Sequence, residues 1–281
     1  MELTTFLLFT VVGVYFLAFV LFVMEFVSAE RKHFRWANRF VEVGFLAHTL
    51  LIFAQTFGVS RTVPSTFHLP VTTLGEASGF FAWSLAFVYL ILLRRRKSET
   101  FGLVLTPVLV LFLIPGFFQY RANPNLQKHF HDGYFLLHIL SAFFGYASFA
   151  LSFIASALYL TLDRVLKRKA SFASYHKFPS LEGLERFIFR TILWGLLLLG
   201  FAIVSGALWS KSAFNTFILK EPKSVASLLT WGTYLVIIYF HELKRAKGKR
   251  IVLVSLGAFV LVLFTFLGTS MFQTGLHVGA W

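Results

Sequence analysis

The fold is decided by residues 199–241, which read LGFAIVSGALWSKSAFNTFILKEPKSVASLLTWGTYLVIIYFH. Two long apolar runs, 191–209 and 225–240, flank a short polar link, and the second run ends at His241. Each run is about long enough for a helix, at ~1.5 Å per residue, to cross the ~30 Å hydrocarbon core of a bilayer. We therefore expect the link at one membrane face and His241 at the other.

The composition extends this interpretation to the whole chain. Apolar residues make up 57% of the sequence and charged residues only 14%, and the mean hydropathy is +0.75. A soluble domain cannot hide so much apolar surface, so the expected fold is an all-α integral membrane protein whose first partner is the lipid bilayer. The absence of cysteine excludes disulfides, thiolate metal sites and thioether attachment of a prosthetic group.

The apolar runs predict about eight transmembrane helices in a single domain spanning residues 1–281. The first run has no basic segment before it and no small-residue cleavage site after it, so we expect it to be retained as a span. No soluble domain, internal repeat or low-complexity tract interrupts the series. The predicted spans are 5–27, 41–57, 71–93, 101–118, 134–162, 191–209, 225–240 and 251–271.

The net charge of +14 is explained by orientation in the membrane and not by nucleic acid. Lys and Arg concentrate on the cytoplasmic side of membrane proteins. With alternate loops assigned to one side, all but six of the 26 basic residues fall on the same side, which predicts a multi-pass protein of the inner, cytoplasmic membrane with both termini outside the cytoplasm. The six exceptions are Arg61, Arg121, Lys128, Lys211, Lys220 and Lys223.

Four histidines are the candidate functional residues. His48 lies early in the second predicted span and His241 ends the seventh, so both are expected toward the inner face. His138 lies about one turn into the fifth span and His277 follows the eighth, so both are expected toward the outer face. An ionisable residue inside a membrane is costly unless it has a partner, and neutral imidazole is a good ligand for haem iron. We expect haem to be bound non-covalently, as haem b, between paired imidazoles.

Each histidine also has a simpler interpretation. A single histidine within a span can hydrogen-bond to a neighbouring helix, and one at a span end can lie among lipid headgroups. Zinc is less favoured than haem, because no histidine or carboxylate recurs at a close helical spacing within the spans. The matched depths of the two pairs favour the haem interpretation.

Short sequence pieces give the chain a resemblance to the cytochrome c assembly family of membrane proteins, the CcsA/CcmC/HemX group. Each piece is short, and the order and spacing of the set carry the resemblance from the second span onward. The pieces are LH at 137–138, FGYASF at 144–149, PSLEGLER at 179–186, SGALW at 205–209, PK at 222–223, LTW at 229–231, YFH at 239–241, FTFLG at 264–268 and LH at 276–277.

The resemblance implies which histidines hold haem. It assigns an outer pair to His138 and His277, and for the CcsA branch also an inner, membrane-embedded pair to His48 and His241. One departure concerns the outer loop, where haem-transferring members carry a tryptophan-rich platform that ends in Trp-Asp-Pro-Lys. Here residues 211–223 read KSAFNTFILKEPK, with no tryptophan and with Glu221 in place of the aspartate, which makes the chain HemX-like in this loop.

Three functions remain open on the sequence alone. The first is a haem carrier of cytochrome c biogenesis, which would transfer or present haem across the membrane with apocytochrome c or an assembly protein as its partner. The second is a HemX-like regulator of a tetrapyrrole-synthesis enzyme, and the third is a two-haem electron carrier. The sequence shows no arrangement of nucleophile, base and oxyanion hole, so we expect a component of a haem attachment system and not an independent enzyme.

The charge distribution gives the first testable prediction. A reporter fused after Trp281 should be active when it requires export from the cytoplasm, because the basic loops hold the opposite face inside. Fusions within the basic loop at 244–250 serve as the control and should show the reverse. Activity of a strictly cytoplasmic reporter at Trp281 would contradict the orientation.

Overall fold

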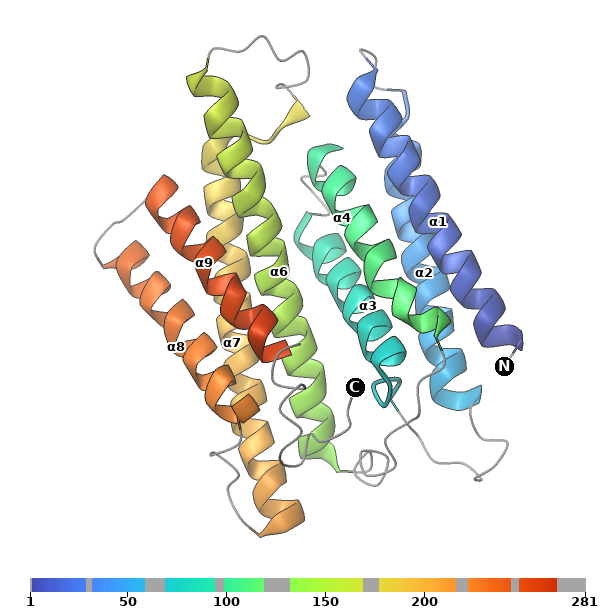
Figure 1. Ribbon diagram of the computed structural model, residues 1–281, viewed down its shortest axis with the longest axis vertical. Helices are drawn as coiled ribbons and strands as arrows, with labels where there is room; N and C mark the ends of the chain where they lie inside the picture. The colour runs from blue at the N-terminus through green and yellow to red at the C-terminus, as the bar shows by residue number, and fades with distance from the viewer. Residues whose placement is uncertain are drawn as a thin grey trace. The chain divides into compact units, whose positions relative to one another are not determined.

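The computed structural model describes residues 2–28, 32–58, 69–93, 99–118, 132–168, 177–215, 222–243 and 248–266 (Figure 1). In these ranges the secondary structure consists of eight α-helices and one 3₁₀ helix, without a strand. Seven helical segments are long and apolar enough to cross a membrane, and one of them, Thr100–Phe117, joins an α-helix to the 3₁₀ helix. The prediction of an all-α integral membrane protein is therefore confirmed.

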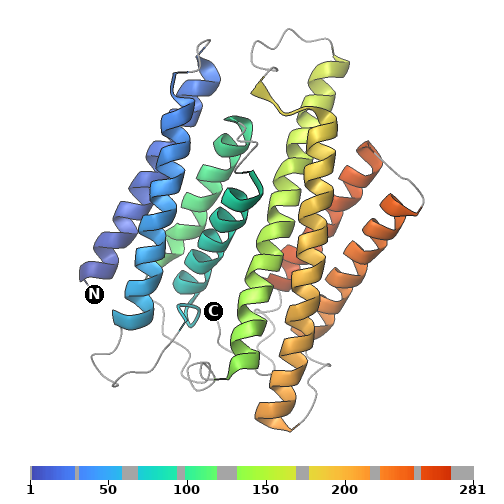
Figure 2. The ribbon, with the colours of Figure 1, turned by 180° about the vertical axis from the view of Figure 1, so that it is seen from behind.

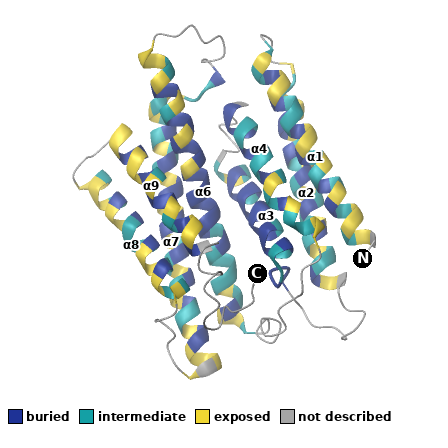
Figure 3. Cartoon of the chain, viewed as in Figure 1, coloured by how far each residue is buried: buried dark blue, intermediate teal, exposed yellow. Residues whose placement is uncertain are grey.

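The eighth helix, α9 (Lys249–Phe266), lies where the last span was predicted. The predicted end of that span, after residue 266, is outside the described residues, as is His277. Many large apolar side chains on the helices are exposed, among them Leu46 at 63% and Phe201 at 69%. Figure 3 colours the exposed residues of the helices yellow. Those named here are apolar, as expected of side chains that a spanning helix presents to lipid.

The chain divides into two compact units, and the prediction of one domain over 1–281 stays a prediction. Unit 1 contains Met1–Gln127 and Lys169–Pro179, and unit 2 contains Lys128–Arg168 and Ser180–Trp281. The segment Lys169–Pro179 therefore belongs to unit 1, although the residues before and after it in the sequence belong to unit 2. Each unit is described separately below.

Unit 1 is a bundle in which α1 packs against α2 and α4, and α3 packs against α4 and the 3₁₀ helix (Figures 1 and 2). Pro107 lies inside α4, and Pro115 lies in the 3₁₀ helix that follows, so the predicted fourth span ends in a tighter turn. The elements are α1 (Glu2–Val27), α2 (Phe34–Gly58), α3 (Leu74–Leu93), α4 (Glu99–Leu113) and η1 (Ile114–Phe117).

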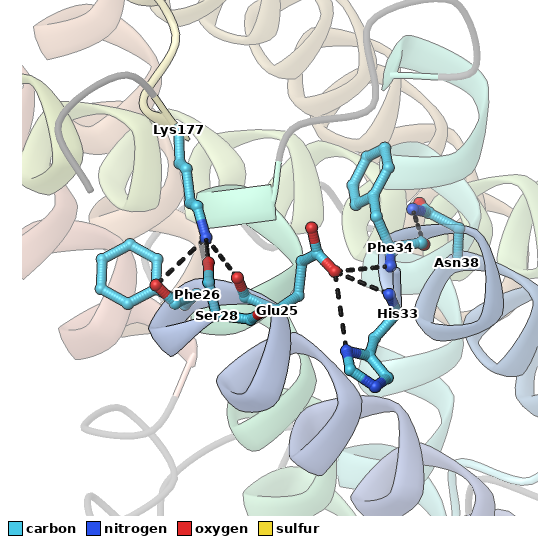
Figure 4. Close-up of polar contacts among 7 residues, drawn as sticks. All are labelled: Glu25, Phe26, Ser28, His33, Phe34, Asn38 and Lys177. Atoms are coloured by element: carbon cyan, nitrogen blue, oxygen red, sulfur yellow. Dashed lines mark hydrogen bonds and ion pairs between the residues drawn. The ribbon is translucent and has the colours of Figure 1, made fainter. Parts of the chain in front are cut away.

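A buried polar cluster joins the end of α1 to the start of α2 (Figure 4). The Glu25 side chain is fully buried, and its Oε2 accepts hydrogen bonds from the backbone N–H groups of His33, at 2.7 Å, and Phe34, at 3.0 Å. These are N–H groups at the beginning of α2, where a helix lacks internal acceptors and its dipole favours negative charge. Glu25 therefore caps α2 from the preceding helix.

Lys177 performs the complementary role at the end of α1. Its Nζ donates to the backbone carbonyls of Glu25, Phe26 (3.3 Å) and Ser28 (2.6 Å), as Figure 4 shows. The Lys177 carbonyl accepts from Thr100 Oγ1, at the start of α4, at 2.9 Å. A cation is favoured at a helix C-terminus, so this one residue fastens the segment Lys169–Pro179 to both α1 and α4 within unit 1.

Unit 2 is organised on a pair of long helices, α6 (Gly133–Lys167) and α7 (Leu181–Phe214), with α8 (Pro222–Glu242) against α7 and α9 against both α6 and α8. At 35 and 34 residues, α6 and α7 are about 50 Å long and exceed the ~30 Å hydrocarbon core. Ser180 caps α7 by accepting a hydrogen bond from Gly183 N at 3.1 Å. The helix that begins there continues without interruption into the predicted sixth span.

Two glycines let α6 and α7 approach closely. A Cβ at Gly145 would lie 3.1 Å from the backbone nitrogen of Leu199, and a Cβ at Gly195 would lie 2.5 Å from the ring of Phe149. The Phe149 ring in turn stacks on Tyr234 of α8, with ring centroids 3.8 Å apart and planes 9° apart. Three helices are thereby fixed in one register.

The Lys177 contacts give a stability prediction. Lys177→Met removes the charged donor that three carbonyls share at a site where the side chain is only 5% exposed, so the free energy of unfolding should fall by about 2–3 kcal/mol. The matched control is Lys167→Met, because the Lys167 side chain is 66% exposed and its pair with Asp163 contributes at most about 1 kcal/mol. Thermal unfolding of the purified protein in detergent measures both, and equal midpoints for the two variants would contradict this account.

Candidate functional site

His138 lies in the second turn of α6, close to the depth that the sequence predicted, and its ring is held by α7. Nδ1 is 2.7 Å from the carbonyl oxygen of Ala202. A carbonyl can only accept, so Nδ1 carries the proton and donates it, and Nε2 carries the lone pair of the neutral ring. The contact thus selects the tautomer of His138 and fixes the orientation of its ring.

Gly206 makes room for this imidazole. Ala202 and Gly206 are four residues apart and therefore share one face of α7. A Cβ at Gly206 would lie 2.6 Å from His138 Nδ1 and 2.9 Å from Cε1, closer than real contacts allow. The SGALW piece at 205–209 thus includes the glycine against which His138 lies.

The residues around His138 fit a haem iron, the group that the sequence resemblance implies. A histidine that ligates a metal typically donates its other ring N–H to a carbonyl or carboxylate, which fixes the tautomer and raises the basicity of the ligating nitrogen. The Ala202 carbonyl meets this requirement. The expected second member of the outer pair, His277, lies outside the described residues.

His241 is the penultimate residue of α8, and its ring is held by two neighbours. The ring stacks on Phe189 of α7, with centroids 4.1 Å apart and planes 22° apart. Nδ1 lies 3.3 Å from Oε1 of Glu242. The His241 side chain is only 16% exposed although it lies at a helix end, so the structure places it within unit 2 rather than in open solvent.

His48 is fully buried in α2, with the ring of Tyr15 from α1 edge-on to it at a centroid distance of 6.1 Å. Tyr15 occupies the space beside Gly44, where a Cβ would be 2.8 Å from the tyrosine ring. Within the described part of the chain, both ring nitrogens of His48 and the hydroxyl of Tyr15 lack a hydrogen-bond partner. Burying such groups unpaired is costly, so these atoms keep His48 a candidate ligand.

The structure changes the expected depth of His48. Because α2 begins at Phe34 and not at residue 41, His48 lies fourteen residues along the helix, about 21 Å from its start, whereas His241 lies at the very end of α8. The two histidines also belong to different units, so the inner pair stays a prediction.

The polar cluster of Glu25 and Lys177 was not among the predicted sites. Glu25 is the single carboxylate inside the first predicted span, and the rule that singled out the histidines applies equally to it. Lys177 carried no such signal, because its acceptors lie about 150 residues earlier in the sequence. In the described residues no three His, Cys, Asp or Glu side chains form a metal-binding group.

Comparison with known proteins relates most of the chain to one family. The family model described as "Cytochrome C assembly protein" matches residues 71–277. That range includes His138, His241 and His277 and begins after His48. The first two helices of unit 1 therefore lie outside the match.

Curated relatives share less than a third of their residues with the chain but align over most of its length. A protein named "Cytochrome c biogenesis protein CcsA" from Prochlorococcus marinus (strain MIT 9312) is 24% identical over 76% of this chain and 77% of its own. The protein of that name from Trieres chinensis is 23% identical over 93% of this chain and 94% of its own. Another from Chlamydomonas reinhardtii is 26% identical over 75% of this chain and 60% of its own.

The fit of His138 against Gly206 gives a prediction that needs no ligand. Gly206→Ala should displace the imidazole from the Ala202 carbonyl and lower the free energy of unfolding by about 1–3 kcal/mol, as overpacking does. Gly232→Ala in α8 is the matched control, because nothing lies within 4 Å of its added Cβ and alanine favours a helix. Thermal unfolding should separate the two variants, and a stabilising effect of Gly206→Ala would contradict the geometry.

Proposed function

This chain belongs to the cytochrome c assembly protein family, and from that premise we propose that it binds haem through paired histidines and carries or presents it across the membrane. It is a membrane protein of cytochrome c biogenesis. The proposed ligands are His138 with His277 as the outer pair and His48 with His241 as the inner pair, although His48 lies further along its helix than the sequence predicted. The haem is proposed to be b-type and held without a covalent bond.

The observation that supports this function best is the hydrogen bond between His138 Nδ1 and the Ala202 carbonyl, at 2.7 Å. An interhelical hydrogen bond alone would explain why the histidine lies in a span. The same contact also fixes the tautomer, so that Nε2 keeps the lone pair, and Gly206 leaves room for the ring to be held in this way. A fixed tautomer and a fixed ring orientation are typical of a histidine that ligates a metal.

His48 supports the inner site by a different argument. A buried polar group without a hydrogen-bond partner costs about 1–3 kcal/mol, and both nitrogens of His48 are in this state within the described residues. A bound ligand would satisfy one nitrogen. His241 offers the complementary case, because its ring already has neighbours that hold it in place.

The chemistry asked of the protein is ligation and exclusion of water, without a covalent step. Haem, when bound, would supply an iron that accepts nitrogen lone pairs. His138 and His241 would donate those lone pairs from Nε2, since a neighbouring acceptor contacts Nδ1 of each ring. We propose apocytochrome c or another assembly protein as the partner that receives the haem, and the inner membrane as the location.

A HemX-like regulator is the second candidate, and the sequence of residues 211–223, which includes the end of α7 and the start of α8, is the observation that favours it. This segment contains no tryptophan on which a presented haem could stack. A regulator of a tetrapyrrole-synthesis enzyme would use the basic cytoplasmic loops as its docking surface. An absorption spectrum of the purified protein separates the two, because only the carrier must retain haem.

The outer pair is tested by replacing both its members. His138→Ala with His277→Ala should remove the low-spin haem spectrum of the outer site and lower the haem content, because two axial ligands are lost. For each single variant, free imidazole should restore part of the low-spin signal by filling the vacated position. His68→Ala, in a predicted loop, is the control and should leave the spectrum unchanged. An unchanged haem content and spectrum in the well-folded double variant would rule out the outer site.

A further inference from the structure

We propose that Phe189 and Glu242 are positioning residues for His241: the aromatic ring fixes the plane of the imidazole and the carboxylate fixes its tautomer. The inference deepens the proposed function, on which it rests, because it takes His241 to be an axial ligand of the inner site. It concerns two side chains that the sequence did not single out, one on α7 and one at the end of α8.

The local geometry of α8 sets His241 apart from its neighbours. The helix remains regular to its end, since Leu243 N donates to the Tyr239 carbonyl at 3.0 Å. Tyr239 and Phe240 are exposed, whereas His241 is half-buried. At the end of a helix, an unrestrained imidazole would gain conformational entropy by turning to solvent. Something therefore holds it inward.

Phe189 supplies that restraint. Its ring lies almost parallel to the imidazole, with centroids 4.1 Å apart and planes at 22°. Two stacked rings cannot rotate independently about their Cβ–Cγ bonds without a clash, so the plane of His241 is set by α7. An axial ligand requires such a fixed plane, because a ring that rotates freely loses entropy when it binds iron.

Glu242 selects the ligating nitrogen. Its Oε1 lies 3.3 Å from His241 Nδ1, and a carboxylate can only accept, so the proton belongs on Nδ1 and the lone pair on Nε2. The Glu242 side chain is 59% exposed, so water weakens the contact as an ion pair. The His241 tautomer is still set by this contact, because Glu242 can accept a hydrogen bond from Nδ1 whether or not the two side chains form a strong ion pair. The negative charge of Glu242 beside the ligand would favour ferric over ferrous iron and so lower the reduction potential of a bound haem.

His138 and His241 are both oriented by an oxygen acceptor at Nδ1, but the acceptors differ. In each, Nδ1 faces an oxygen acceptor, which is a backbone carbonyl for His138 and a carboxylate for His241. A carboxylate is the stronger acceptor. The Glu242 contact is nevertheless the longer of the two, at 3.3 Å against 2.7 Å, and it is open to water.

The experiment uses holoprotein that carries His138→Ala and His277→Ala, so that retained haem reports the inner site. Phe189→Ala should weaken haem retention by about tenfold or more, the usual cost of losing a residue that orients a ligand, and Phe189→Trp should restore it by offering another stacking face. Glu242→Gln should keep the haem but raise its reduction potential. The controls are Phe201→Ala, an exposed α7 phenylalanine, and Glu182→Gln, an exposed glutamate paired with Arg186.

The outcomes separate this inference from the proposed function. If His241→Ala leaves the inner haem spectrum unchanged, then His241 is not a ligand and both proposals fail. If His241→Ala abolishes the spectrum while Phe189→Ala and Glu242→Gln behave as their controls do, the ligand stands and the positioning role is overturned. Loss of haem in Phe189→Ala that Phe189→Trp does not rescue, with a lowered unfolding midpoint, would likewise overturn the role of Phe189 and reduce it to packing.

Discussion

The absence of side chains at Gly145 and Gly195 lets α6 and α7 pack with their backbones close together, and the other features of unit 2 depend on this contact. At one level it brings the Phe149 ring against Tyr234 and so attaches α8. Nearer the start of α6 it places the Ala202 carbonyl where His138 can donate to it. In a membrane, where the hydrophobic effect does not drive helices together, close packing and interhelical hydrogen bonds must supply the association energy.

Most of the helices could be predicted from hydropathy, because a chain in hydrocarbon has few other options. The ends could not. The second span begins at Phe34, seven residues before its predicted start, since Arg35, Asn38 and Arg39 are polar enough to resemble a loop yet belong to the helix. Likewise α7 begins at Leu181 and includes charged turns outside the apolar run. Hydropathy marks where the hydrocarbon lies, whereas capping and backbone hydrogen bonds decide where a helix stops.

The candidate site was predictable only in part, for a related reason. The rule that ionisable residues in spans need partners identifies His48 and His138 as candidates, but a pattern along one helix cannot say which residue of another helix will meet them. The acceptor for His138 and its glycine neighbour depend on the register of α6 against α7. The stacking of Phe189 on His241 likewise depends on how α8 packs against α7, whereas Glu242 is next to His241 in the sequence. The same rule could have identified the buried Glu25, which lies in the first predicted span, but it could not have identified Lys177, which lies outside the spans.

Lys177 also constrains the order in which the protein can be made. The carbonyls that it contacts at the end of α1 are synthesised first, and Lys177 follows Ser28 by 149 residues. At ~5–20 residues per second this interval is about 7–30 s, during which α2, α3, α4 and α6 are all synthesised. The end of α1 must remain in contact with water or headgroups until then, because it has no access to its final donor. Unit 1 is thus completed by a segment that arrives after the first helix of unit 2, and the two units are assembled in alternation and not one after the other.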